Sequence, residues 1–533
     1  MLLYSLVLIL PPALLIACGL IPGRWANRHV HVMRSGALVL LALAFCGSLS
    51  ATALLVSSGP LDVALIQTSW PIPLNLGVYF DSLAAVMLLL ISFIGLIIAR
   101  YSVRYLAGEA TQGRFLRWIL FTLGSVLLLI LSRNLVMFTA AWMMTSLGLH
   151  QLLIHYSDRP WAVWAARKKF LISRLGDLFL IGALVLTWHC FGTFDYSEVF
   201  AAAQLSQQAL SASSSLIAVT GLLLAFGAMT KSAQFPFHTW LPDTMETPTP
   251  VSSLMHAGII NAGGFLVIRL SPLVSTSPAA MELLAVTGAF TALFGGVVML
   301  TQTSVKRSLA YSTMAQMGFM MLQCGLGAYS AALLHIVAHS LYKAHAFLSS
   351  GSTLDTAAQT KSTVQLTPAR NPFTRLPAAC ITAVVLSGSL AWMSGIDLAN
   401  KQGAGILGFI LVLALTHVIW RALATDSWRL ATRGIGFAAL SCACYLAGFL
   451  LMDRILASTV SIRLASPSAM SDPVTALVMI GFLSAAVLQA AALSGHRSPR
   501  LKALYVHAMH GFYLDIPARR LTAMFWGRAT PAP

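Results

Sequence analysis

Long apolar segments recur along the whole chain and are separated by short polar ones. Each apolar segment holds about 17–25 residues, enough for a helix to cross a hydrocarbon layer roughly 30 Å thick. Because backbone polar groups in lipid must pair within their own segment, the pattern predicts an all-α polytopic transmembrane bundle of about 15 spans. We expect the spans near residues 3–20, 35–57, 78–99, 115–132, 135–156, 170–191, 216–235, 251–271, 280–302, 308–327, 330–350, 378–396, 403–420, 434–452 and 473–494.

The composition agrees with this pattern and excludes a water-soluble enzyme. Of 533 residues, 58% are hydrophobic and only 9% are charged, and the mean hydropathy is +0.80. No long polar segment interrupts the spans, so residues 1–494 are expected to form one transmembrane domain. Residues 495–533 are expected to form a basic cytoplasmic tail, either an interfacial helix or a docking segment. The seven cysteines show no metal-ligand spacing, so we expect no cofactor in this chain.

The net charge of +17 is explained by the loops in which the basic residues lie. Loops after odd-numbered spans, together with the tail, hold 25 of the 33 lysines and arginines, whereas loops after even-numbered spans hold four. Arginine and lysine accumulate on the cytoplasmic side, so we expect the N-terminus outside and the C-terminus inside. A nucleic-acid partner is not expected, because the chain has no aromatic-rich basic domain.

One region at membrane depth cannot form a continuous helix. Residues 229–256 contain Pro236, Pro242, Pro248 and Pro250 around Lys231 and His238. Proline removes backbone donors, and irregular backbone inside a bilayer is tolerated only where protein or a water-filled cavity satisfies it. Broken helices of this kind mark ion sites in many transporters.

Ionisable residues within the spans are the candidate functional groups, because each costs about 2.5–3.5 kcal/mol on insertion scales. Lys231 has no acidic residue within a helical turn, and a desolvated lysine can accept and release protons. Arg174 and Asp177 are three residues apart and so share a helix face. They are expected to form a buried ion pair, or Asp177 modulates a nearby lysine.

A second set of titratable groups lies on the eleventh predicted span. His335, His339 and Lys343 are spaced by four, so each step advances about 400° and all three share one stripe of a helix. With His256 on the eighth span, they form a candidate proton relay. A single membrane histidine is more often a packing residue, and no carboxylate or cysteine is spaced to complete a zinc site.

At these residues the chain resembles the antiporter-like family of complex I proton-pumping subunits and the large subunits of multisubunit sodium/proton antiporters. The resemblance covers roughly residues 75–350. Its strongest motifs are I-S-R-L-G-D at 172–177, T-K-S-A-Q-F-P-F-H-T-W-L-P-D at 230–243, V-K-R-S-L-A-Y-S at 305–312 and H-I-V-A-H-S-L-Y-K at 335–343. It implies that Lys231 is the channel lysine, that His256 and His335 or His339 are linking groups, and that Lys343 is the central lysine.

The chain departs from the family's pattern at two places. Met143 stands where the family usually has a glutamate that tunes the channel lysine. The twelfth predicted span, 378–396, carries no charge where the family usually has a lysine or glutamate, and Asp397 and Lys401 are the nearest substitutes. The chain also ends at residue 533 with a short basic tail instead of a long lateral helix, so a complex I subunit is not expected.

This combination is most similar to the DabB subunits of bacterial DAB inorganic carbon accumulation complexes. That resemblance implies an inner-membrane subunit that conducts H⁺ or Na⁺ and drives CO2 hydration on a cytoplasmic partner. The implied partner resembles DabA, a zinc protein similar to β-carbonic anhydrases, so zinc and enzyme chemistry are expected on the partner and not here. The alternatives are a subunit of a cation/proton antiporter or of a redox-driven pump, and a membrane scaffold that anchors a soluble enzyme.

Overall fold

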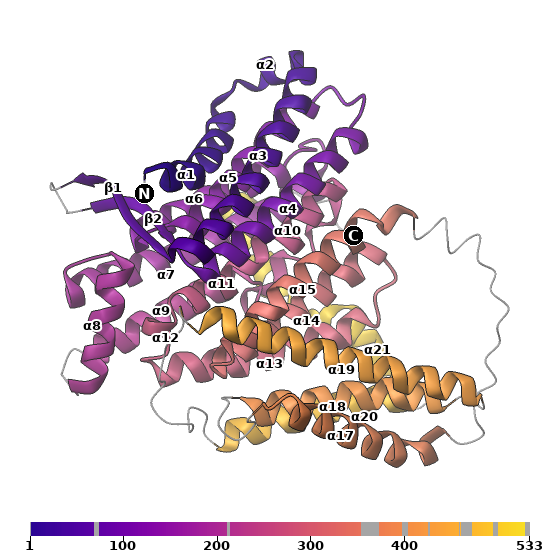
Figure 1. The fold of residues 1–533 in the computed structure, drawn as a ribbon. Coiled ribbons are helices and arrows are strands. Elements are labelled where there is room, and N and C mark those ends of the chain that lie inside the picture. The colour runs from indigo at the N-terminus through magenta and orange to yellow at the C-terminus, as the bar shows by residue number, and fades with distance from the viewer. Residues whose placement is uncertain are drawn as a thin grey trace.

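Helices make up almost all of the structure, a computed structural model (Figure 1). It describes residues 2–68, 74–209, 214–352, 372–396, 403–424, 427–457, 459, 472–493 and 499–527. Every one of the fifteen expected spans overlaps an observed helix or a pair of helices, which confirms the predicted all-α membrane bundle. Among the described residues, ten helices are long and apolar enough to cross a membrane, and two shorter apolar helices accompany them.

The first third of the chain forms an N-terminal helical group with one short β-hairpin at its edge (Figure 1). Its elements are α1 (Leu2–Ala17), η1 (Cys18–Leu20), α2 (Gly23–Arg28), α3 (Val30–Ser58), β1 (Leu61–Thr68), β2 (Leu74–Phe80), α4 (Ser82–Tyr105), α5 (Gln112–Leu131) and α6 (Leu135–Leu153). The hairpin was not predicted. Its antiparallel strands pair Leu61 with Phe80, and a bulge shifts the register between Ala64 and Ile66.

The middle of the chain contains the interrupted helices that the proline spacing predicted. Its elements are α7 (Pro160–Phe191), α8 (Tyr196–Ala209), α9 (Ser214–Lys231), η2 (Phe237–Trp240), η3 (Thr244–Glu246), α10 (Thr249–Ala257), η4 (Ile259–Asn261), α11 (Ala262–Arg269), α12 (Ser271–Val274), α13 (Pro278–Met299), α14 (Val305–Gly325) and α15 (Tyr329–Leu348). The eighth expected span is itself broken, because η4 separates α10 from α11.

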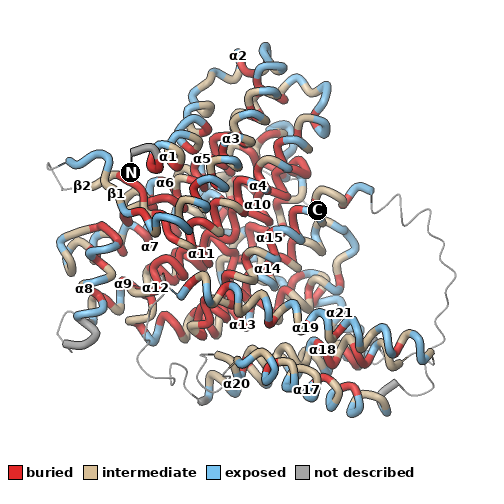
Figure 2. Tube along the Cα trace, viewed as in Figure 1, coloured by how far each residue is buried: buried red, intermediate tan, exposed pale blue. Residues whose placement is uncertain are grey.

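In the last third, one group of helices forms a layer along one side of the bundle (Figure 1). This layer comprises η5 (Pro372–Arg375), α17 (Leu376–Met393), α18 (Ala404–Leu423), α19 (Trp428–Leu456) and α20 (Asp472–Leu493). The tail that follows, with α21 (Pro499–Met509), η6 (Gly511–Tyr513) and α22 (Ile516–Trp526), packs on the main bundle instead. The layer has its own small core, which includes Leu415, Ile419, Trp420 and Cys442. Figure 2 shows that buried residues concentrate in the main bundle and are sparse in this layer.

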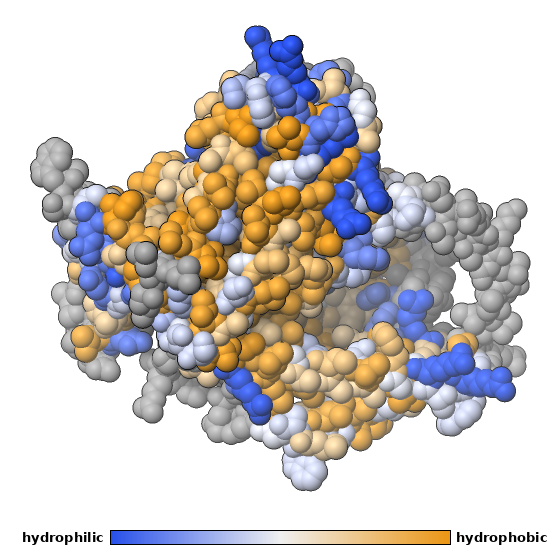
Figure 3. Space-filling model, turned by 45° about the horizontal axis from the view of Figure 1, so that its top comes forward, coloured by the Kyte–Doolittle hydropathy of each residue, from blue (hydrophilic) through white to orange (hydrophobic). Residues whose placement is uncertain are grey.

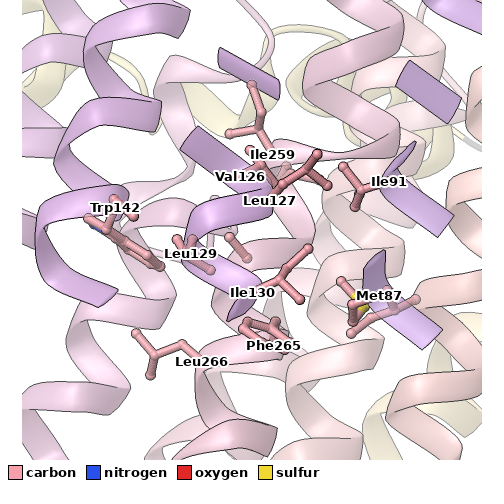
Figure 4. Packing of buried hydrophobic residues seen from close by; sticks show 14 of the residues in the cluster. Met87, Ile91, Val126, Leu127, Leu129, Ile130, Trp142, Ile259, Phe265 and Leu266 are labelled. Carbon is pink, nitrogen blue, oxygen red and sulfur yellow. The ribbon is translucent and has the colours of Figure 1, made fainter. Parts of the chain in front are cut away.

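The outer surface is apolar and the interior is tightly packed. Hydrophobic side chains cover most of the face in Figure 3, and hydrophilic ones gather toward its edges. Figure 4 shows the interior near α6, where Trp142 lies beside aliphatic side chains from α5 and α11, including Leu129 and Leu266. An apolar exterior of this kind suits lipid, so the chain is a multi-pass membrane protein.

One buried ion pair joins α4 to α11. The Arg269 guanidinium donates to both carboxylate oxygens of Asp81, at 2.5 and 2.9 Å, and both residues are buried. Asp81 also caps α4 by accepting from the backbone N–H of Ala84 at 2.9 Å. A bidentate pair satisfies both charges where water is excluded, so it fixes α11 against the N-terminal helices.

Removing one member of this pair should leave an uncompensated buried charge. We predict that Asp81→Asn, which keeps the helix cap, lowers the free energy of unfolding by about 3–5 kcal/mol. The double variant Asp81→Asn/Arg269→Met should recover most of that loss. Unfolding of the purified protein in detergent measures both values, and a single variant as stable as the wild type would show that the pair is not buried.

Candidate functional site

The predicted channel lysine ends α9 and points into the bundle. The Lys231 side chain is 6% exposed, and its amine donates to Ser146 Oγ at 2.9 Å and to the Trp142 carbonyl at 3.2 Å. The amine also lies 4.4 Å from the centre of the Trp142 ring, close enough for a cation–π contact. Both partners are on α6, four residues apart and therefore on one face of that helix.

The chain beyond Lys231 is irregular, as the four prolines predicted. The backbone continues as two short 3-10 helices before α10 begins at Thr249. His238, on η2, is buried between the rings of Phe235 and Phe294, at centroid distances of 5.7 and 5.2 Å. The structure therefore places His238 among aromatic rings on the irregular segment and hydrogen-bonds it to neither Lys231 nor Lys343.

Arg174 and Asp177 form the predicted ion pair within α7, with Nη2 and Oδ2 2.7 Å apart. Asp177 is buried, whereas the Arg174 side chain is 44% exposed. Between them, Gly176 packs on α9: a Cβ at this position would lie 2.3 Å from Thr230 Oγ1. This close approach brings the helix that carries Asp177 against the residue next to Lys231.

The second cluster forms where α10 packs on α15. Lys343 is fully buried and donates to the Leu309 carbonyl, in the first turn of α14, at 3.0 Å. The His256 ring stacks on the Phe347 ring at 4.3 Å. A ring nitrogen of His339 lies 3.3 Å from the His256 carbonyl. His339 and Lys343 thus share one face of α15, as their spacing of four predicted, and His256 on α10 lies against His339.

His335 lies farther along the same stripe of α15. Its ring centroid is 6.0 Å from that of His339 and 5.6 Å from that of Phe319. It is only half-buried, unlike His339. The stripe on α15 thus runs from buried Lys343 through His339 to His335, toward a less buried part of the helix.

The short helix η4 connects the two clusters. Ser232, next to Lys231, donates to the Ile260 carbonyl at 2.6 Å. Asn261 donates to Ser340 Oγ at 2.7 Å, beside His339 on α15, and to the Ala257 carbonyl at 2.9 Å. Sequence reasoning missed Asn261, although a lone amide within an apolar span was a usable signal.

Several buried polar atoms along this route have no hydrogen-bond partner among the described residues. Both ring nitrogens of His256 are in this state, as are Ser253 Oγ and Asn261 Oδ1. Gln234 Oε1 and His238 Nδ1 extend the series into the segment beyond Lys231. Buried polar groups are rarely left unpaired, and internal water is their usual partner where protein supplies none.

Two lysines were assigned to a cytoplasmic loop, and the structure corrects this. Helix α7 begins at Pro160, ten residues before the expected span, so Lys168 and Lys169 lie within it and are buried. Lys168 forms ion pairs with Asp243, on the irregular segment, and with Asp515, in the tail. Proline at the first position of a helix was the signal that could have placed its start correctly.

The tail packs on the body of the protein in the described part of the chain. Besides the Asp515–Lys168 pair, the Met509 carbonyl accepts from Gln302 at 3.2 Å, and the Phe512 ring lies 6.0 Å from that of Phe294. Its predicted role, as an interfacial or docking segment, stays a prediction.

The two departures from the family's pattern have different outcomes. Met143 is half-buried on α6, and the hydrogen bonds of Lys231 are made instead to Trp142 and Ser146 on the same helix. Asp397 and Lys401, the proposed substitutes on the twelfth span, lie outside the described residues.

Comparison with known proteins shows the family to which the chain belongs. The sequence profile of the NADH:quinone oxidoreductase/Mrp antiporter transmembrane family matches residues 132–399, the region that contains both lysine clusters. The profile described as the N-terminus of complex I chain 5 matches residues 67–116. The chain belongs to this family. The match covers the interrupted helices of the present chain.

Two curated relatives and one solved structure refine the assignment. The chain is 37% identical to "Probable inorganic carbon transporter subunit DabB2" of Halothiobacillus neapolitanus, over 98% of this chain and 94% of that protein. It is 38% identical to "Probable inorganic carbon transporter subunit DabB" of Hydrogenovibrio crunogenus, over 67% of each chain. The predicted resemblance to DabB subunits is confirmed.

The solved structure of the Mrp complex from Dietzia sp. DQ12-45-1b contains a similar chain, with 26% identity and a TM-score of 0.58. The similarity covers 98% of this chain and 58% of that one. The antiporter-like fold therefore extends over nearly the whole of the present chain.

The link between the clusters depends on the close approach of α11 to α9 at Gly263. A Cβ there would lie 2.3 Å from Ser232 Oγ and 2.5 Å from the Ala228 carbonyl. We predict that Gly263→Ala lowers the free energy of unfolding by about 1–3 kcal/mol through overpacking.

Gly296 on α13 is the matched control, because a Cβ there would meet nothing within 4 Å. Gly296→Ala should be neutral or stabilise by about 0.5–1 kcal/mol. Unfolding of both variants in detergent compares them, and equal stabilities would contradict the tight packing of α11 on α9.

Proposed function

We propose that the chain conducts protons across the bacterial inner membrane through its two buried lysine clusters. The observation that carries this proposal is a row of buried polar groups between the clusters: Ser232, next to Lys231, bonds to η4, and Asn261 at the end of η4 bonds to Ser340, next to His339. Amines and imidazoles held in such a series can exchange protons, with internal water joining the gaps.

The chemistry of the series favours H⁺ over Na⁺. Sodium ions, like other hard cations, require several oxygen ligands, whereas the ends of this route are lysine amines and histidine nitrogens. A protonated amine repels a cation, and a neutral amine takes up a proton with high affinity. The groups are therefore suited to binding and releasing protons.

We further propose that proton flow through this subunit drives the hydration of CO2 to bicarbonate on a soluble cytoplasmic partner. This step rests on the two relatives named as inorganic carbon transporter subunits. The partner would resemble DabA and would hold zinc. In this chain, the described residues contain no group of three His, Cys, Asp or Glu side chains that could hold a metal ion. The proposal places the N-terminus outside, with the basic tail on the cytoplasmic face that meets the partner.

A second candidate function is a subunit of a cation/proton antiporter or of a complex I-like redox-driven pump. The likeness to a chain of the Mrp complex favours it. The two candidates share the proton route and differ in what the route drives.

Growth of cells that lack carbonic anhydrase distinguishes the two functions. Such cells need added CO2, and expression of this chain with the proteins encoded beside it should restore growth in air. Expression of this chain alone is the control and should not. If co-expression with the neighbouring proteins fails to restore growth while the chain still conducts protons, the role in CO2 hydration is wrong. A subunit of an antiporter or of a redox-driven pump is then the better description.

Replacement of Lys231 or Lys343 should strongly reduce conduction without loss of assembly. We predict that Lys231→Ala and Lys343→Ala each reduce proton flux into proteoliposomes by roughly tenfold or more, equivalent to about 1.4 kcal/mol in the barrier. Lys502→Ala, at an exposed position on α21, is the control and should leave flux unchanged. Full flux and activity in both assembled lysine variants would instead support a scaffold that anchors a soluble enzyme.

A further inference from the structure

A second lysine shares the polar partner of Lys231. Lys169, on α7, is only 3% exposed, and its amine donates to the backbone carbonyl of Ser146 at 2.7 Å. The amine of Lys231 donates to the hydroxyl of the same serine at 2.9 Å. Two buried amines from different helices are therefore bonded to atoms of one residue.

Among the described residues, no carboxylate forms a hydrogen bond or an ion pair with either amine. The acidic group near them is Asp177, which is already paired with Arg174 on its own helix. The ion pairs of the described residues include none made by Lys169 or Lys231. The other charged or titratable groups near the pair are Arg174 on α7 and His150 on α6.

Two ammonium charges this close in a low-dielectric interior repel each other strongly, whereas one charge shared between two amines does not. Interacting groups of this kind give up protons in steps that belong to the pair and not to either residue. Ser146 supplies acceptors to both amines, so either lysine can hold the charge while the other is neutral.

We propose that Lys169 is a second proton carrier, which exchanges a single proton with Lys231 at Ser146. The proton leaves the ammonium of Lys231 and binds the lone pair of the neutral Lys169 amine, and no other bond changes. The positive charge on one lysine then promotes proton release from the other. Lys169 thereby acts on Lys231 from α7, at a site where Met143 on α6 supplies no charge. This inference rests on proton conduction by the chain.

A purely structural role for Lys169 is the competing explanation, because its hydrogen bond joins α7 to α6. Two substitutions separate the roles. Glutamine keeps a donor for the Ser146 carbonyl but carries no charge, whereas arginine keeps the donor and a permanent charge. Neither can release a proton at physiological pH, so both should reduce conduction if Lys169 carries protons.

The test measures proton flux against pH in proteoliposomes that contain the full chain with its partner. Lys169→Gln and Lys169→Arg should each lower maximal flux by about tenfold or more. The remaining flux should be half-maximal at a higher pH in Lys169→Gln, because Lys231 loses a positive neighbour and holds its proton more tightly. It should be half-maximal at a lower pH in Lys169→Arg, where the positive neighbour is permanent.

Two further variants provide a second test of the exchange at Ser146 and a control. Ser146→Ala retains the backbone acceptor of Lys169 but removes the hydroxyl that binds Lys231, so it should lower flux even if the Lys169 variants do not fold. Lys306→Gln, at the start of α14, is the control and should not change flux or its pH dependence.

Wild-type flux in the assembled Lys169→Gln variant, or the same pH profile in Gln and Arg variants, would overturn the inference. An absence of flux in the wild type would instead overturn the proposed function, so the two failures are distinguishable.

Discussion

A polar backbone group or a charged side chain in the middle of a membrane must find a partner inside the protein, and this requirement organises the structure. Helix α9 stops at Lys231, and α10 stops at Ala257, so two sets of backbone groups lose their regular helical partners. The side chains of Ser232 and Asn261 take over part of that pairing. The interruptions therefore create a polar core inside an apolar bundle.

That polar core accounts for the placement of the ionisable residues. Lysine amines at both ends bond to backbone carbonyls, of Trp142 at one end and of Leu309 at the other. Such bonds hold an amine in place without a neutralising carboxylate, so the charge on each lysine stays sensitive to its neighbours. The bidentate pair of Asp81 and Arg269 shows the opposite arrangement, in which a buried charge is fully matched and fixed.

The sequence predicted the fold and much of the site because these features depend on local patterns. Apolar length located every expected span, four prolines located the break after Lys231, and a spacing of four placed His339 and Lys343 on one face. The sequence could not predict contacts between segments that are far apart along the chain. The bond from Lys169 to Ser146 joins α7 to α6, and the bond from Asn261 to Ser340 joins residues 79 positions apart. Lys169 was also taken for a loop residue, because the positive-inside pattern and the polar start of α7 coincide there.

Proton conduction through both lysine clusters requires water to reach the buried route between them. Hydroxyl-radical footprinting of the assembled protein in lipid tests it most directly, because the radical modifies side chains that contact water. His256 and Phe347 are both fully buried and should be modified rapidly, whereas Phe265 and Phe138, equally buried in apolar packing, should be protected. Equal protection of all four side chains would show that the interior is dry and would contradict a proton route through it.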